Sequence, residues 1–151
     1  MQMATPSLAN GGQPRERDGA GNLTVDRNGA RTFEYNAAGR LYRVYENGHL
    51  VTTYTYNALG QRVRKDTPAG TVLYHYDLQG RLLAETQLDG TPVRDYFYLE
   101  GRPVAQMDYA EAGTGTLTYL HTDHLGTPRV ATDGTGTVVW CWQADTFGAV
   151  Q

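Results

Sequence analysis

Short runs rich in β-branched and aromatic residues fill most of the chain, and turns that contain glycine separate them. Arg40–Tyr45 and Arg81–Thr86 are two such runs, and both have the composition of β-strands. In Thr52–Tyr56 tyrosines alternate with threonines, so neither face of that strand is strongly apolar. No segment predicts a helix of normal length. The pattern therefore predicts an all-β fold.

Four stretches repeat one motif, in which a tyrosine is followed by Asn or Asp and then by glycine. The turn glycines are separated by 21, 20 and 21 residues, a spacing typical of an array of supersecondary units. The repeat positions are Tyr35, Asn36 and Gly39; Tyr56, Asn57 and Gly60; Tyr76, Asp77 and Gly80; and, more loosely, Tyr98 and Gly101. No single unit of such an array buries its own apolar face, so function has to be argued for the whole array.

Each repeat contains two kinds of turn. Asn or Asp, two variable residues and glycine suit a type I turn that ends in a left-handed glycine bulge. The second turns include Asn47–Gly48 and Asp89–Gly90, which predict two-residue type I′ turns. One repeat is then two strands, and the fold is an antiparallel meander of hairpins about 21 residues long.

An aromatic residue precedes each repeat tyrosine by two positions, as Phe33 precedes Tyr35 and Tyr54 precedes Tyr56. Residues two apart in a strand share a face. We expect these pairs to stack into columns across neighbouring strands.

The chain divides by composition into four parts. Residues 1–16 form a polar, flexible leader, and residues 17–108 hold the hairpin repeats, with a weak first copy around Gly21. Residues 109–118 form a connecting turn, and residues 119–151 form a distinct C-terminal segment.

Composition excludes several classes of function. The chain has 151 residues, a net charge of −3 and evenly spread charges, which argue against a nucleic-acid or membrane-surface partner. No apolar run approaches the length of a membrane span, and the first residues lack the features of a signal peptide. Cys141 is the only cysteine, and we expect it to be buried and inert.

The C-terminal segment holds the chain's clustered imidazoles. Its motif residues are His121, Asp123, His124, Leu125, Gly126 and Pro128. Imidazole beside carboxylate suits a metal or a general base, but in a strand His124 would lie opposite His121 and Asp123. There is no second ligand cluster, and the remaining acids occupy turn positions, where they bind backbone groups. We predict no enzyme activity, no metal and no cofactor.

The motif in residues 121–128 resembles the core segment of RHS proteins, and the upstream hairpins resemble their tyrosine-aspartate repeats, which teneurins, bacterial wall-associated proteins and toxin shells share. The resemblance implies a β-sheet that spirals into a hollow shell, encloses a C-terminal toxin and delivers it to another cell. It implies that the chain is secreted or attached to a cell surface as part of a larger exported protein. The partners would be the remainder of the shell and the toxin cargo.

Size limits what this chain does alone. Some 12–14 strands at about 4.8 Å each would close into a tube only about 20 Å across. A toxin of about 100 residues is more than 30 Å across. We therefore expect one segment of a larger shell, truncated at its C-terminus. The alternative is a free-standing module for adhesion or carbohydrate binding, in which the tyrosines face solvent as a stacking surface.

Overall fold

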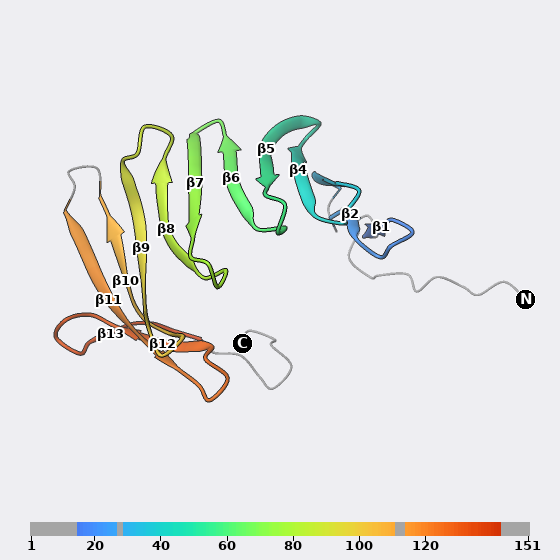
Figure 1. The fold of residues 1–151 in the computed structure, drawn as a ribbon. Coiled ribbons are helices and arrows are strands. Elements are labelled where there is room, and N and C mark those ends of the chain that lie inside the picture. Colours follow the sequence, from blue (N-terminus) through green and yellow to red (C-terminus); the bar gives the residue numbers. More distant parts are fainter. Residues whose placement is uncertain (1–14, 27–28, 111–113, 143–151) are drawn as a thin grey trace, which may run out of the picture. The chain divides into compact units, whose positions relative to one another are not determined.

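The structure, a computed structural model, describes residues 15–26, 29–110 and 114–142. The described residues form thirteen β-strands and no helix, so none of them belongs to a helix that is able to cross a membrane. The strands form one antiparallel sheet in which β1 to β13 are neighbours in the order of the chain. This confirms the all-β meander (Figure 1). Residues 1–14 of the expected leader lie outside the described ranges.

Two compact units make up the chain, residues 1–71 and residues 72–151, and β7 begins in the first and continues into the second. The strands up to β7 are β1 (Glu16–Arg17), β2 (Leu23–Val25), β3 (Arg31–Tyr35), β4 (Leu41–Glu46), β5 (His49–Tyr56), β6 (Arg62–Thr67) and β7 (Gly70–Tyr76). The later strands are β8 (Leu82–Gln87), β9 (Pro92–Leu99), β10 (Arg102–Tyr109), β11 (Gly115–Thr122), β12 (Pro128–Thr132) and β13 (Val138–Cys141). Strand β11 takes in residues 115–118, which the sequence placed in a connecting turn.

The turn between β3 and β4 shows how the repeat motif reverses the chain. The Gly39 N–H donates to the Asn36 carbonyl at 2.8 Å, and Gly39 has φ of 70°, as a type I turn with a left-handed glycine requires. The Asn36 side-chain oxygen accepts the N–H groups of Ala38 and Arg40, both at 3.0 Å. The turns that begin at Asn57, Asp77 and Asp123 repeat this arrangement. The predicted turn chemistry is confirmed at these positions.

The two-residue turns are confirmed only in part. Asn47 and Gly48 have φ of 51° and 79°, as a type I′ turn requires. The prediction for Asp89–Gly90 was wrong, because Gly90 closes a longer turn by donating to the Gln87 carbonyl. A two-residue turn is found instead at Glu100, with φ of 49°, and Gly101.

A β-bulge follows each repeat turn at the third residue after the glycine. Tyr98 is opposite Pro103 while Phe97 is opposite Ala105, so Val104 is the extra residue. The same register shift makes Tyr42, Val63, Leu83 and Arg129 the extra residues of β4, β6, β8 and β12. Each bulge disrupts the hydrogen-bond ladder beside the residue that lies two positions after the glycine.

The expected aromatic columns are not formed. Phe33 is opposite Val44, Tyr54 is opposite Lys65, and Tyr96 is opposite Gln106. The reason is that one repeat contains two strands. Equivalent aromatic residues therefore lie two strands apart, and the residues directly opposite them on the strand between are not aromatic in these three pairs.

The sheet has a single layer and almost no core. Of the described residues only Ala105 and Ala131 are buried, and large apolar side chains such as Phe97 and Trp140 are 43% and 48% exposed. Cys141 is exposed, so the expectation of a buried thiol was wrong. The described residues include no second sheet or helix, which explains this exposure, because each face of a sheet needs a covering element to bury it.

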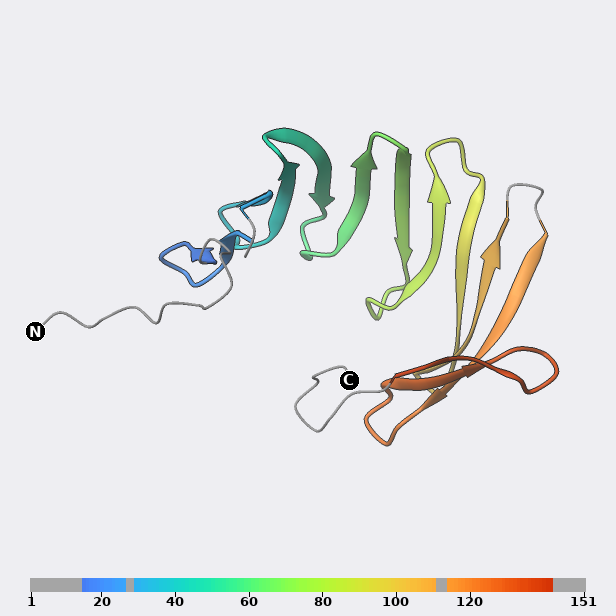
Figure 2. The ribbon, with the colours of Figure 1, turned by 180° about the vertical axis from the view of Figure 1, so that it is seen from behind.

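Within the second unit the sheet coils. Strands β12 and β13 lie across the ends of β9 to β11, and this is visible from both sides (Figures 1 and 2). Side chains of β9 and β13 line one common groove although three strands separate them in the sheet.

Candidate functional site

A repeat tyrosine links its hairpin to the preceding hairpin at residues 35, 56 and 98. In the second unit the Tyr98 hydroxyl donates to the Leu82 carbonyl at 3.0 Å, and the Arg81 guanidinium lies 5.3 Å from the centre of the Tyr98 ring. Leu82 is two residues after the turn glycine Gly80, beside the bulge. The half-buried ring therefore spans from one repeat to the turn of the preceding repeat.

The first unit contains the same arrangement. The Tyr56 hydroxyl donates to the Leu41 carbonyl at 2.6 Å, and the Arg40 guanidinium lies 6.0 Å from the Tyr56 ring centre. Tyr35 donates to the Leu23 carbonyl at 2.9 Å. Leu23 is two residues after Gly21, so the weak first repeat is a structural copy of the others.

We call this arrangement the tyrosine brace: a repeat tyrosine, the carbonyl that it binds two residues after the preceding turn glycine, and, where present, the arginine one residue after that glycine. A side-chain hydrogen bond of this kind contributes about 0.5–1.5 kcal/mol. A cation over an exposed ring adds about 0.5–1 kcal/mol. The brace was missed in the sequence, where its signal is arginine directly after one turn glycine and tyrosine directly before the next repeat turn, as in Arg40 with Tyr56 and Arg81 with Tyr98.

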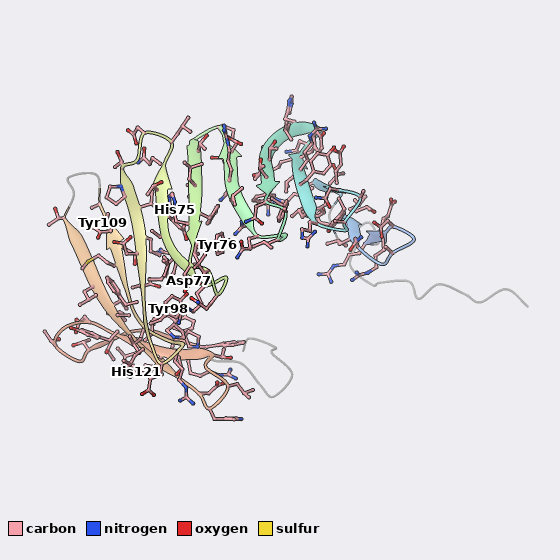
Figure 3. All side chains as sticks on the ribbon, in the orientation of Figure 1. His75, Tyr76, Asp77, Tyr98, Tyr109 and His121 are labelled. Atoms are coloured by element: carbon pink, nitrogen blue, oxygen red, sulfur yellow. The ribbon has the colours of Figure 1, made fainter. Side chains whose placement is uncertain are left out.

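Asp77 fixes the turn that the Tyr98 brace binds. Burial disfavours its charge, but the backbone N–H and the guanidinium of Arg81 outweigh burial and hold the pKa of Asp77 below its usual range. The Arg81 Nε lies 2.6 Å from the carboxylate. The same arginine thus pairs with the turn acid and covers the tyrosine ring. Figure 3 shows Asp77 and Tyr98 toward one end of the second unit and Tyr109 toward the other.

The C-terminal motif is built as another repeat turn. Asp123 accepts the N–H groups of Leu125 and Thr127 at 2.9 and 3.0 Å, and Gly126 has φ of 80°. Its second carboxylate oxygen binds Arg129 Nε at 2.9 Å. The Thr127 N–H and Arg129 hold the pKa of Asp123 below its usual range. This carboxylate is therefore fully engaged in structural contacts.

The two motif histidines do not converge with Asp123 on a site. His121 Nε2 lies within hydrogen-bond distance of the Thr132 hydroxyl, at 3.0 Å, and His124 is exposed in the turn. Leu125 is exposed beside it, and Pro128 starts β12. The part of the chain that the structure describes contains no group of three His, Cys, Asp or Glu residues placed to bind a metal.

A groove of about 540 Å³ lies on one face of the second unit. It is lined by Tyr96, Tyr98, Pro103, Gln106, Thr118, Leu120, Pro128, Ala131, Val139 and Trp140. Its size is within the range of about 300–1,000 Å³ that is usual for ligand pockets. Its aromatic and apolar lining suits an apolar or aromatic group.

A polar network borders the groove at Tyr96 and Gln106. The Tyr96 hydroxyl donates to Glu85 at 2.5 Å, while Asp108 accepts from Gln106 at 2.8 Å and pairs with Arg94. Burial and the hydrogen bond to Glu85 raise the pKa of Tyr96 to about 12. These side chains engage one another, so they stiffen this wall of the groove.

Comparison with known proteins identifies the repeats. Residues 35–72 and 56–92 match the RHS repeat, and residues 118–151 match the family described as RHS protein. The chain is 31% identical to double-stranded DNA deaminase toxin A of Burkholderia cenocepacia, over 90% of this chain and 12% of the toxin. It is 29% identical to teneurin-3 of Mus musculus, over 81% of this chain and 5% of teneurin-3.

The matched residues are those that form the structural features above. The RHS repeat covers the hairpins with their aspartate or asparagine turns, and the RHS protein match covers the turn at Asp123. The hairpins in this region serve as a structural array. This chain belongs to the RHS family.

Proposed function

We propose that this chain is a non-enzymatic wall segment of a β-shell that encloses a C-terminal toxin and delivers it to a competing or host cell. The observation that carries the proposal is the single-layer, coiling sheet in a chain of the RHS family. Only two alanines are buried among the described residues. A sheet that exposes both faces suits a wall, which has one face toward a cargo and one toward solvent.

The strand number supports a segment rather than a whole container. Thirteen strands at about 4.8 Å each give a sheet roughly 60 Å wide. Closed on itself, such a sheet has a diameter of about 20 Å, which is smaller than a folded domain of about 100 residues. The partners are therefore the rest of the shell and the toxin cargo.

The lengths of the relatives also support a segment of a larger protein. This chain spans about an eighth of the deaminase toxin and a twentieth of teneurin-3. A repeat array that forms a small part of a long protein is consistent with one arc of a shell. In this proposal the toxic activity resides in another part of the protein, and the shell is secreted or attached to the cell surface.

Sequencing the genomic DNA on both sides of the coding region tests the proposal. We expect further tyrosine-aspartate repeats upstream and a toxin-like region downstream in the same reading frame. Unrelated neighbours and stop codons on both sides would contradict the shell. That result would favour an adhesion module that recognises carbohydrate.

A further inference from the structure

One tyrosine brace is incomplete in the second unit. Arg102 and Pro103 follow Gly101 as Arg81 and Leu82 follow Gly80. Tyr98 completes the brace with Arg81. The residue that would complete the brace with Arg102 directly precedes the turn acid Asp123, and it is Thr122. Threonine has neither the ring that would lie under Arg102 nor a hydroxyl at the far end of a ring.

The groove lies at the place of this missing ring. Pro103, which would supply the acceptor carbonyl, lines it, and so does Pro128, which is opposite Thr122 in the sheet. Leu120 is two residues before Thr122 on the same face and also lines the groove. Thr122 thus has a groove residue beside it on its own strand, Leu120, and another opposite it on β12, Pro128.

The arginine that covers a tyrosine ring in the complete braces covers no ring here. Arg102 is exposed, and within the described ranges its guanidinium has no ion pair and covers no ring. No side chain of the described residues donates to the Pro103 carbonyl. By contrast, Arg81 covers Tyr98, and the Leu82 carbonyl accepts its hydroxyl.

We propose that this groove binds a tyrosine side chain presented by an extended segment of a separate polypeptide. The ring lies beneath the Arg102 guanidinium, and its hydroxyl donates to the Pro103 carbonyl. Trp140 and Leu120 contact the flanking side chains of the segment.

The chain itself indicates the occupant. The two braces at Tyr56 and Tyr98 show a tyrosine over the same arginine and carbonyl positions. The groove volume of about 540 Å³ leaves room for neighbouring residues of the segment. A polypeptide fits better than a sugar, because the lining is mainly apolar and the Gln106 amide is already bound to Asp108.

Binding of a synthetic peptide tests the proposal. The peptide has the sequence of residues 55–62, in which Tyr56 is the only aromatic residue. The protein carries Trp142→Phe, which leaves Trp140 in the groove as its only tryptophan and reporter. We expect a saturable change in Trp140 fluorescence, several-fold weaker binding of the Tyr56→Phe peptide and no binding of the Tyr56→Thr peptide.

Protein variants locate the binding. Arg102→Ala should weaken binding several-fold, whereas Arg15→Ala, at an exposed arginine outside the second unit, should leave it unchanged. Thr122→Tyr should rebuild the brace, raise the melting temperature and abolish peptide binding. Thr122→Phe should also block the groove but raise the melting temperature less.

Three results would overturn the proposal. The first is an equal fluorescence response to the tyrosine and threonine peptides. The second is unchanged binding by Thr122→Tyr in a protein that still unfolds cooperatively. The third is no saturable response at any concentration, which is also the result expected if residues 143–151 or a second copy of the chain occupy the groove.

Discussion

Replacement of Tyr98 tests whether the brace stabilises the array. Tyr98→Phe removes the hydroxyl that donates to the Leu82 carbonyl at 3.0 Å but keeps the ring beside Arg81. Loss of one such hydrogen bond destabilises by about 1 kcal/mol. The second unit has residues 72–151, and for a domain of that size 1 kcal/mol corresponds to about 4–8 °C in melting temperature.

Tyr98→Thr extends this test, because it makes residue 98 the same as residue 122. It removes the ring as well as the hydroxyl, and we expect a loss of about 2–3 kcal/mol from the hydrogen bond, the cation–π contact and the apolar contacts together. A double-mutant cycle with Arg81→Ala should give a coupling of about 0.5–1 kcal/mol for Tyr98→Thr. The coupling for Tyr98→Phe should be near zero, because phenylalanine keeps the ring.

The assay is urea denaturation followed by circular dichroism, with Tyr119→Phe as the matched control. Tyr119 is 43% exposed, and no hydrogen bond of its hydroxyl is found in the described part of the chain. Removal of the Tyr119 hydroxyl should therefore change the free energy of unfolding little. Equal effects of Tyr98→Phe and Tyr119→Phe would refute the role of the brace.

Three further predictions concern the turns and the polar network. Gly39→Ala should destabilise by about 1 kcal/mol, because Gly39 has φ of 70°, and thermal melts should show no comparable loss for Gly134→Ala. The pKa of Asp77 is lower in the folded state, so its contribution to stability should be present above its unfolded pKa and lost as the pH falls through the folded value. Hydrogen exchange should therefore show this turn opening in acid. Asp77→Asn, which gives residue 77 the asparagine that Asn57 has in the equivalent turn, should remove that pH dependence. The pKa of Tyr96 is raised to about 12, so its contribution should be present below about pH 10 and lost as the pH rises to 12. In ultraviolet titration, a tyrosinate signal of Tyr96 already complete at pH 10, judged against Tyr96→Phe, would contradict this.

The sequence predicted the local features well, because the turns depend on residues close together in the chain. The turn at Asn36 and Gly39 is held by hydrogen bonds among residues 36–39, so its geometry depends on four consecutive residues. Asp89–Gly90 failed because the same dipeptide also suits the end of a longer turn, and the strand register decides between them.

The groove could not be predicted from local pattern. It depends on the coiling that brings β13 to β9, and on what residue 122 lacks relative to Tyr56 and Tyr98. The bulges that expose the acceptor carbonyls are likewise set by pairing between strands. The repeat spacing was visible in the sequence, but the role of arginine after the turn glycine required the brace geometry.

Protease protection tests the shell most directly. The full-length product of the reading frame that contains this chain would be digested with trypsin, intact and after the repeats are destabilised by Tyr98→Thr. We predict that the C-terminal cargo resists digestion in the intact protein and is degraded in the variant. Equally rapid degradation of the cargo in both proteins would contradict the claim that these strands form the wall of a container.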